Sequence, residues 1–197
     1  MNWKTVGAVT SVGMVVSLVS TAAAAPAPRV EMEVEGRGKV VLELYPKDAP
    51  KTVAHFLDLC RRGFYTGIRF HRVRPGFVAQ AGDPATREMK AEELAGKSDE
   101  DLAAMNIGGG GSGKNVVFEN SPRKHEPGAL SFALSAPRSN TGDSQFFIDL
   151  VANPRLNGDY CVFGKVVQGM PVVRTIQQGD RIVRVTVLGA SPATKRK

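Results

Sequence analysis

Cysteine is scarce in this chain: Cys60 and Cys161 are the only two, and they lie far apart in the sequence. So few cysteines exclude a disulfide-rich scaffold, and neither has partners at the spacing of a zinc site. The two can form one disulfide, or they can be two small buried apolar side chains. We favour the second interpretation, because an ordinary core of this size needs no covalent bridge.

Long apolar runs are also lacking, apart from residues 6–19 near the N-terminus. This run is shorter than the ~20 residues that a helix needs to span a bilayer. Lys4 precedes it and four alanines at residues 22–25 follow it, a pattern typical of a signal peptide over residues 1–24, with a membrane anchor as the alternative. We therefore expect an exported chain, periplasmic or secreted, that has no membrane segment after the signal is removed.

Motifs for metal, nucleotide and hydrolytic chemistry are absent or incomplete. The three histidines do not have the spacing of metal ligands, and no G-x-S-x-G sequence marks a hydrolase nucleophile. Residues 108–114 have the spacing of a phosphate-binding G-x-x-x-x-G-K loop, but Asn115 replaces the Ser or Thr that binds magnesium. The apolar residues 116–118 also follow where a helix should start. We expect no metal and no cofactor.

Acidic residues are in the minority, with 19 Asp and Glu against 26 Lys and Arg, so the formal net charge is +7. Part of this excess lies in a basic tail over residues 191–197. A basic balance permits contact with nucleic acid, but the chain has no long basic helix and no alternation of aromatic and basic residues. We interpret the charge as a solvated surface and expect no nucleic-acid partner.

Residues 29–190 predict one domain that is rich in short strands. Residues 30–35 alternate apolar and acidic side chains, and after a glycine-containing turn residues 39–44 predict a second strand, so together they indicate a β-hairpin with one buried face. Further strands are predicted at residues 67–73, 77–81, 128–135, 144–151, 161–167 and 181–188. This many short strands favours an antiparallel barrel or sandwich over a parallel α/β sheet.

Two segments predict helices. Apolar residues at helical spacing from Val53 to Cys60 predict one, with Asp48 as its N-cap and Gly63 at its end. Residues 171–178 predict a second, shorter helix. Residues 84–115 interrupt the strand pattern with a charged, helix-prone stretch followed by the glycine run, and we interpret them as a surface insertion in one loop.

Four segments carry the most specific pattern: FHRVRPGFVAQAGD at residues 70–83, GALSFA at 128–133, SQFFI at 144–148 and LNGDYCVFGKV at 156–166. Together, and in this order, they resemble the cyclophilin family, and the resemblance runs from about Val30 to Leu188. It implies a mainly β fold, a closed eight-stranded antiparallel β-barrel capped by two α-helices, with a proline-binding site on one outer face. It also implies an enzyme, a peptidyl-prolyl cis/trans isomerase.

The resemblance also implies roles for nine residues. Arg72 would be the catalytic arginine, and Gln80 would help to place Arg72 and the substrate. Taken singly, an aromatic residue in a strand is more often part of the core, and only the joint pattern supports these roles. The substrate-binding residues would be Phe77 and Phe147 as walls of the proline pocket, together with Val78, Phe132, Gln145, Leu156 and Tyr160.

Four positions depart from the family pattern. Val78 stands where Met is frequent, Ala81 where a second Gly is usual, Arg155 where Trp or Phe is usual, and Tyr160 where His is usual. We expect a recognisable but modified pocket. Because Arg155 removes an aromatic side chain that contacts cyclosporin in many members, the resemblance does not extend to binding of this drug.

An arginine suits the implied reaction. Resonance gives the peptide C–N bond a rotational barrier of ~18–20 kcal/mol, and X-Pro bonds are those that populate both isomers appreciably. When the bond is twisted, the prolyl nitrogen becomes a hydrogen-bond acceptor, so a donor aimed at it stabilises the transition state more than the substrate. The guanidinium of Arg72 can supply that donor without a nucleophile, a metal or a general base.

The sequence therefore predicts a monomeric enzyme that accelerates rotation about X-Pro bonds and assists the folding of exported proteins. Its partners would be proline-containing polypeptides and unfolded exported proteins. Two alternatives stay open: a proline-binding chaperone of the same fold with negligible turnover, and a basic nucleic-acid-binding β-barrel. Arg72 argues against the first, and the lack of aromatic platforms beside a basic stripe argues against the second.

Overall fold

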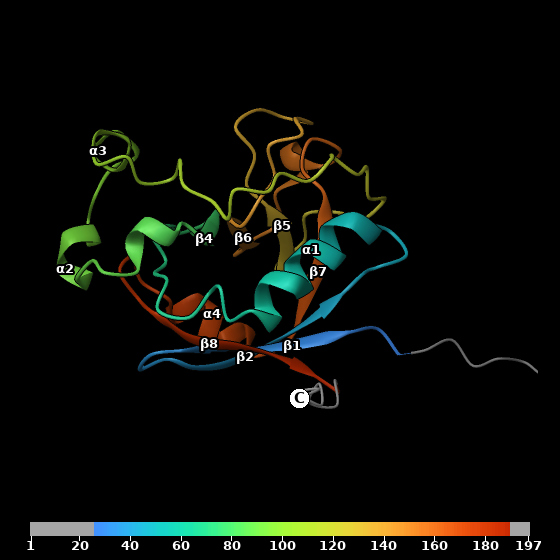
Figure 1. Cartoon of the computed structure of the whole chain (residues 1–197), viewed down its shortest axis with the longest axis horizontal. Helices are drawn as coiled ribbons and strands as arrows, with labels where there is room; N and C mark the ends of the chain where they lie inside the picture. Colours follow the sequence, from blue (N-terminus) through green and yellow to red (C-terminus); the bar gives the residue numbers. More distant parts are fainter. Residues whose placement is uncertain (1–25, 190–197) are drawn as a thin grey trace, which may run out of the picture.

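Figure 1 shows the computed structural model, which describes residues 26–189 as a curled antiparallel sheet with helices around it. The predicted signal peptide, residues 1–24, and the predicted basic tail, residues 191–197, lie outside these residues. Within them, eight strands follow the spatial order β3-β4-β6-β5-β7-β2-β1-β8, which confirms the predicted fold class. Their bounds are β1 Arg29–Val34, β2 Gly38–Leu44, β3 Arg72–Arg74, β4 Val78–Ala81, β5 Ala129–Phe132, β6 Phe146–Asp149, β7 Val162–Gln168 and β8 Ile182–Leu188.

The hairpin of β1 and β2 forms as the alternation of side chains predicts. Val30, Met32 and Val34 are buried on the inner face of β1, while the acidic residues between them are partly exposed. Gly36 has φ +67°, a left-handed conformation that favours glycine, and it lies in the turn between the strands. β1 also pairs with β8, so the hairpin lies inside the sheet and not at its edge.

Irregular backbone, and not a full ladder, completes the curl between β3 and β8. Arg69 and Arg181 form an isolated antiparallel bridge, and Gly67 and Ile68 exchange hydrogen bonds of 2.8 Å with Ile182. The strand predicted at residues 67–73 is therefore shorter than expected: only its last part enters the β3–β4 ladder. Gly67, at φ +83°, has a conformation that a regular strand does not allow, and it begins the irregular part.

The first helix, α1 (Pro50–Arg61), lies where the periodicity predicts it, but Asp48 is not its N-cap, which corrects that prediction. Ala49 occupies the cap position and offers no side-chain acceptor. The carboxylate of Glu119 accepts two free N–H groups of the first turn, at 3.0 and 2.8 Å. The cap thus comes from a distant part of the sequence, which no local pattern reveals.

The C-terminal end of α1 and the second helix agree more closely with the sequence. Gly63, at φ +68°, follows the end of α1, as expected for a residue that stops a helix. The predicted second helix is α4 (Met170–Thr175), which starts one residue earlier than expected and ends three residues earlier. No helix between residues 26 and 189 is both long and apolar enough to cross a membrane.

Aromatic side chains from α1 and the sheet form the centre of the core. The ring of Phe56 lies 5.2 Å from that of Phe163 and 5.9 Å from that of Phe146, measured between centroids.

Cys60 and Cys161 are both free and buried, which confirms the interpretation as small apolar side chains. Burial raises the pKa of the Cys161 thiol to about 11 and that of Cys60 well above its usual range.

The insertion at residues 84–115 is a folded arm, called the insertion arm below. It contains η1 (Pro84–Thr86), α2 (Ala91–Leu94) and α3 (Asp99–Ala104), and α2 and α3 lie together at one side of the molecule (Figure 1). Leu94, Leu102 and Ile107 form a small apolar cluster of their own. The arm therefore has enough buried contacts to hold its side chains in fixed places.

The glycine run within the arm is a loop, as the sequence predicts. Its backbone is tied down by the buried carboxylate of Asp83, which accepts the N–H of Gly108 at 2.6 Å and that of Gly110 at 3.2 Å. In the described chain no helix follows this loop before η2 (Pro154–Leu156). The loop-to-helix arrangement of a phosphate-binding site is thus not formed there.

Candidate active site

Strand register brings together three predicted site residues that are distant in the sequence. Arg72 on β3 is paired with Gln80 on β4, and Gln80 is paired with Phe147 on β6. Directly opposed residues of antiparallel strands project to the same face of the sheet. The three side chains therefore form one row across neighbouring strands, with a cation at one end and an aromatic ring at the other.

This row lines a cavity of about 260 Å³. Seven of the nine predicted site residues line it, and the sequence analysis missed two more, Ala133 and Leu134, which follow β5 directly. Ala133 belongs to one of the motif segments, so its place in that segment was a usable signal. The lining residues are Arg72, Phe77, Val78, Gln80, Ala133, Leu134, Phe147, Leu156 and Tyr160.

Phe132 is not brought to this cavity. In the ladder between β5 and β6, Ser131 opposes Phe147 and Phe132 opposes Phe146, so Phe132 lies on the core face of the sheet. Its ring packs 4.8 Å from that of Phe163, and its side chain is 4% exposed. The register of β5, which motif reading does not supply, decides this placement.

Gln145 lies beside the cavity and links it to the insertion arm. Its side-chain oxygen accepts the amide of Gln80 at 3.1 Å, and its own amide donates to the carbonyl of Gly110 at 2.8 Å. Gln145 and the glycine run line a second cavity of about 330 Å³, which Gln80 also borders. The two cavities therefore meet at Gln80.

One part of the wall of the first cavity, away from Arg72 and Gln80, is apolar and closely packed. Phe147 and Val78 are buried, and the Phe147 ring meets the Tyr160 ring edge-on at 5.8 Å. The ring of His125 stacks behind Phe147, also at 5.8 Å and with an interplanar angle of 15°. A small apolar ring such as that of proline fits such walls, because burying it removes apolar surface from water.

A buried polar network supports these walls from behind. His125 Nδ1 lies 2.8 Å from the carboxylate of Asp149, and both side chains are fully buried. Asn153 donates to Asp149 at 2.5 Å and to the carbonyl oxygen of Phe77 at 3.2 Å. His125 Nε2 faces the carbonyl of Tyr160 at 3.2 Å. No sequence motif indicates this network, because its members come together only when the strands pair.

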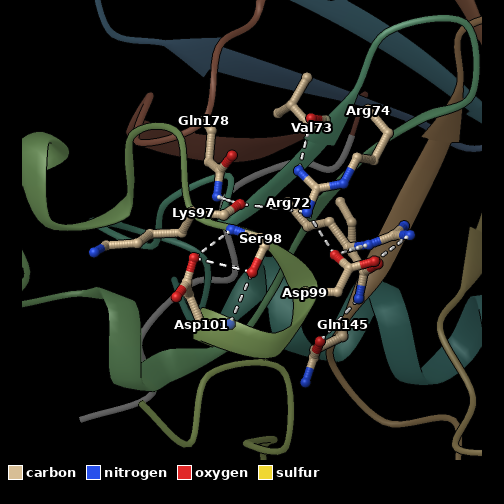
Figure 2. A network of polar contacts seen from close by, with 10 residues as sticks. Arg72, Val73, Arg74, Lys97, Ser98, Asp99, Asp101, Gln145 and Gln178 are labelled. Carbon is tan, nitrogen blue, oxygen red and sulfur yellow. Dashed lines mark hydrogen bonds and ion pairs between the residues drawn. The ribbon is translucent and has the colours of Figure 1, made fainter. Parts of the chain in front are cut away.

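The guanidinium of Arg72 borders the cavity and is held from outside it. Its Nε and Nη2 atoms donate to the carboxylate of Asp99, at 2.9 and 3.1 Å (Figure 2). Its central carbon lies 5.7 Å from the centroid of the Phe77 ring. The hydrogen bonds from Arg72 lower the pKa of Asp99. Asp99 belongs to the insertion arm and was not among the residues that the sequence analysis selected.

His71, the neighbour of Arg72, is buried, and within residues 26–189 neither of its ring nitrogens has a hydrogen-bond partner. Burial lowers its pKa from 6.5 to about 4, so the ring is neutral near pH 7. Over the same residues, no group of three His, Cys, Asp or Glu side chains is arranged to hold a metal ion.

Comparison with known proteins points to one family. A family profile described as "Cyclophilin type peptidyl-prolyl cis-trans isomerase/CLD" matches residues 29–191. The chain is 40% identical over 157 residues to peptidyl-prolyl cis-trans isomerase B of Bacillus subtilis, covering 79% of this chain and 94% of that protein. It is 39% identical over 153 residues to a peptidyl-prolyl cis-trans isomerase of Helicobacter pylori, covering 76% and 80% of the two chains.

Solved structures give the same result. A crystal structure of a cyclophilin-type peptidyl-prolyl cis-trans isomerase of Cryptosporidium parvum superposes with a TM-score of 0.66 at 25% identity, covering 84% of this chain and 99% of that one. A crystal structure of the same protein in the presence of the dipeptide Ala-Pro gives a TM-score of 0.64 at 27% identity, covering 82% and 99%.

Proposed function

The chain belongs to the cyclophilin-type peptidyl-prolyl cis-trans isomerases, and we propose that it isomerises X-Pro bonds in the cavity that Arg72 lines. The observation that carries this proposal is the strand register, which places Arg72 and Gln80 in one row with the apolar wall of Phe147. A cation with free donors beside a small apolar cavity is the arrangement that this reaction needs.

The apolar part of the site holds the proline. Its walls leave a cavity of about 260 Å³, and their buried support fixes the rings in place. The Cryptosporidium parvum relative was crystallised in the presence of Ala-Pro, which supports X-Pro peptides as substrates for this chain as well. With the pyrrolidine ring held still, the acyl side of the bond turns.

The charged part of the site stabilises the twisted bond. A guanidinium carries five N–H donors, and Asp99 accepts from the Nε and Nη2 atoms of Arg72. Among residues 26–189, the Nη1 group has no hydrogen-bond partner, so its two hydrogens are available to a substrate. A preorganised donor of this kind lowers an activation barrier by roughly 3–4 kcal/mol, and fixing the proline adds to this.

We also propose that the substrates are unfolded exported proteins and that the chain itself works outside the cytoplasm, in the periplasm or as a secreted monomer. The support is Lys4, the apolar run at residues 6–19 and the alanines at residues 22–25. Export predicts a mature N-terminus at Ala25 or within one or two residues of it. N-terminal sequencing of exported protein that found Met1 intact would reject this part of the proposal.

The experiment that tests the activity is a protease-coupled isomerisation assay of the mature chain with an Ala-Pro-containing peptide. We expect the slow cis-to-trans phase, which takes tens of seconds without an enzyme, to become faster in proportion to enzyme concentration. A chain that bound the peptide without accelerating this phase would be a proline-binding module and not an isomerase.

A further inference from the structure

The insertion arm presents one carboxylate to the site. Asp99 is the first residue of α3, and the residues around it fix where that helix begins. Ser98 is the N-cap: its hydroxyl accepts the N–H of Asp101 at 3.1 Å, while the Asp101 carboxylate accepts the N–H of Ser98 at 2.9 Å. This reciprocal capping sets the backbone that carries Asp99.

The arm is also tied to the body of the protein close to Asp99. The carbonyl oxygen of Lys97 accepts from Gln178 at 3.2 Å and from Arg74 at 3.3 Å (Figure 2). These contacts join the arm to β3 and to the segment after α4. The position of the Asp99 carboxylate is therefore set by contacts on both sides of it.

Two arginines of β3 share this carboxylate. Arg72 and Arg74 are two residues apart, so they project to the same face of the strand. Asp99 Oδ1 lies 2.6 Å from Arg74 Nη2 and 2.9 Å from Arg72 Nε. Without a carboxylate between them, the two guanidinium groups would repel each other and would not share a fixed arrangement. The lowered pKa of Asp99 keeps the carboxylate ionised near pH 7.

The ion pair leaves the cavity open. Asp99 does not line either of the cavities that meet at Gln80, and its side chain is 51% exposed. Arg72, in contrast, lines the first cavity, which is the proposed site of the proline ring and is called the proline cavity from here on. The Asp99 carboxylate thus accepts hydrogen bonds from the Nε and Nη2 edge of the guanidinium and leaves Nη1 available to a substrate. Gln80, which the sequence analysis selected to place Arg72, donates to Gln145 instead.

We propose that Asp99 of the insertion arm is the positioning residue of Arg72, holding its guanidinium in the orientation that the isomerisation requires. This inference rests on the proposed function of Arg72. The carboxylate acts through Arg72 and does not touch the substrate. An opposite role, in which Asp99 competes with the substrate for Arg72 and inhibits the enzyme, predicts a change of activity in the other direction.

Asp99→Asn tests the proposal, because it removes the charge and keeps the shape. We expect kcat/KM to fall about tenfold, mostly through kcat, which is less than the ~10²-fold that a 1 Å misplacement of a catalytic group can cost. Asp99→Glu, which restores the charge, should recover part of the loss. Glu100→Gln is the matched control: this exposed residue is the next in α3, and its change should leave the activity as it is.

A double-mutant cycle that combines Asp99→Asn with Arg72→Ala tests this proposal separately from the proposed function. In the Arg72→Ala background, Asp99→Asn should have no further effect, whereas a general structural role would add its own loss. Thermal unfolding of each variant shows that it is folded. If Arg72→Ala loses most of its activity while Asp99→Asn is as active as the parent or more active, Asp99 does not position Arg72. If Arg72→Ala keeps full activity, it is the proposed function that fails.

Discussion

Arg72 and Gln80 lie directly opposite each other in the β3–β4 ladder, yet their side chains take different partners. Arg72 donates to Asp99 in the insertion arm, and Gln80 donates to Gln145 at the edge of the second cavity. The arm thus contacts Arg72 directly through Asp99, and it is linked to Gln80 through Gln145, whose amide donates to the carbonyl of Gly110. An insertion that looks peripheral in the sequence therefore lies against the proposed active site.

Phe147→Ala should weaken substrate binding. The substitution removes the ring that forms one wall of the proline cavity, and losing the burial of such a contact, about 1.5 kcal/mol or more, raises KM about tenfold or more. Steady-state kinetics with an X-Pro peptide measures this. Phe132→Leu is the control, because Phe132 lies in the core: it should lower the free energy of unfolding and leave KM as it is. An unchanged KM in Phe147→Ala would contradict the placement of the proline.

Glu119→Ala should destabilise the protein by about 1–3 kcal/mol, since it leaves two N–H groups at the start of α1 without their acceptor. Asp48→Ala makes the matched comparison. It removes only a half-exposed ion pair with Arg123, so it should cost less than about 1 kcal/mol. Urea unfolding of both variants tests the pair, and an equal or larger loss for Asp48→Ala would be incompatible with Glu119 as the cap.

The predicted cap of α1, Asp48, and the observed one, Glu119, show which features can be predicted from the sequence and which cannot. Alternating burial in β1 and the helical spacing from Val53 to Cys60 are local signals, so the hairpin and α1 could be predicted from the sequence. The partner of the first turn of α1 depends on how segments about 70 residues apart pack together, and Asp48 was the wrong choice. Local patterns contain no information about such packing.

The residues of the candidate site also fall into a predictable and an unpredictable group. Residues that line the cavity, such as Arg72 and Phe77, belong to sequence motifs, because their types follow from the chemistry of the reaction. Phe132 could not be placed without the register of β5, and Asp99 stands in a segment with no motif at all. Its role depends on where the insertion arm folds back, which composition and periodicity do not determine.

His71 should make the stability depend on pH below neutrality. Its pKa is about 4 in the folded protein, below its usual value of 6.5, because it is buried. Above pH 6.5 the ring is neutral in both states. Between pH 6.5 and 4 the unfolded chain binds a proton that the folded chain does not. The free energy of unfolding therefore decreases as the pH is lowered through this range, by at most roughly 3 kcal/mol.

The test of this prediction is the free energy of unfolding measured by urea at pH 7 and at pH 4.5, for the parent and for His71→Leu. Leucine cannot bind a proton, so the variant should lose less stability on acidification than the parent does. An identical loss in both proteins would mean that His71 is not the group responsible. Activity at pH 7 should be retained in the folded variant, since no step uses the ring.

The central claim is that Arg72 stabilises the twisted X-Pro bond, and the most direct measurement is kcat/KM of Arg72→Ala and Arg72→Lys beside the affinity of each variant for an X-Pro peptide. We expect Arg72→Ala to lose about 10²- to 10³-fold in kcat/KM while peptide affinity changes much less, because the donor acts mainly in the transition state. Arg72→Lys should recover only part of the loss, since an ammonium lacks the planar set of donors. Full activity in Arg72→Ala, or a loss that lies entirely in peptide affinity, would contradict this account.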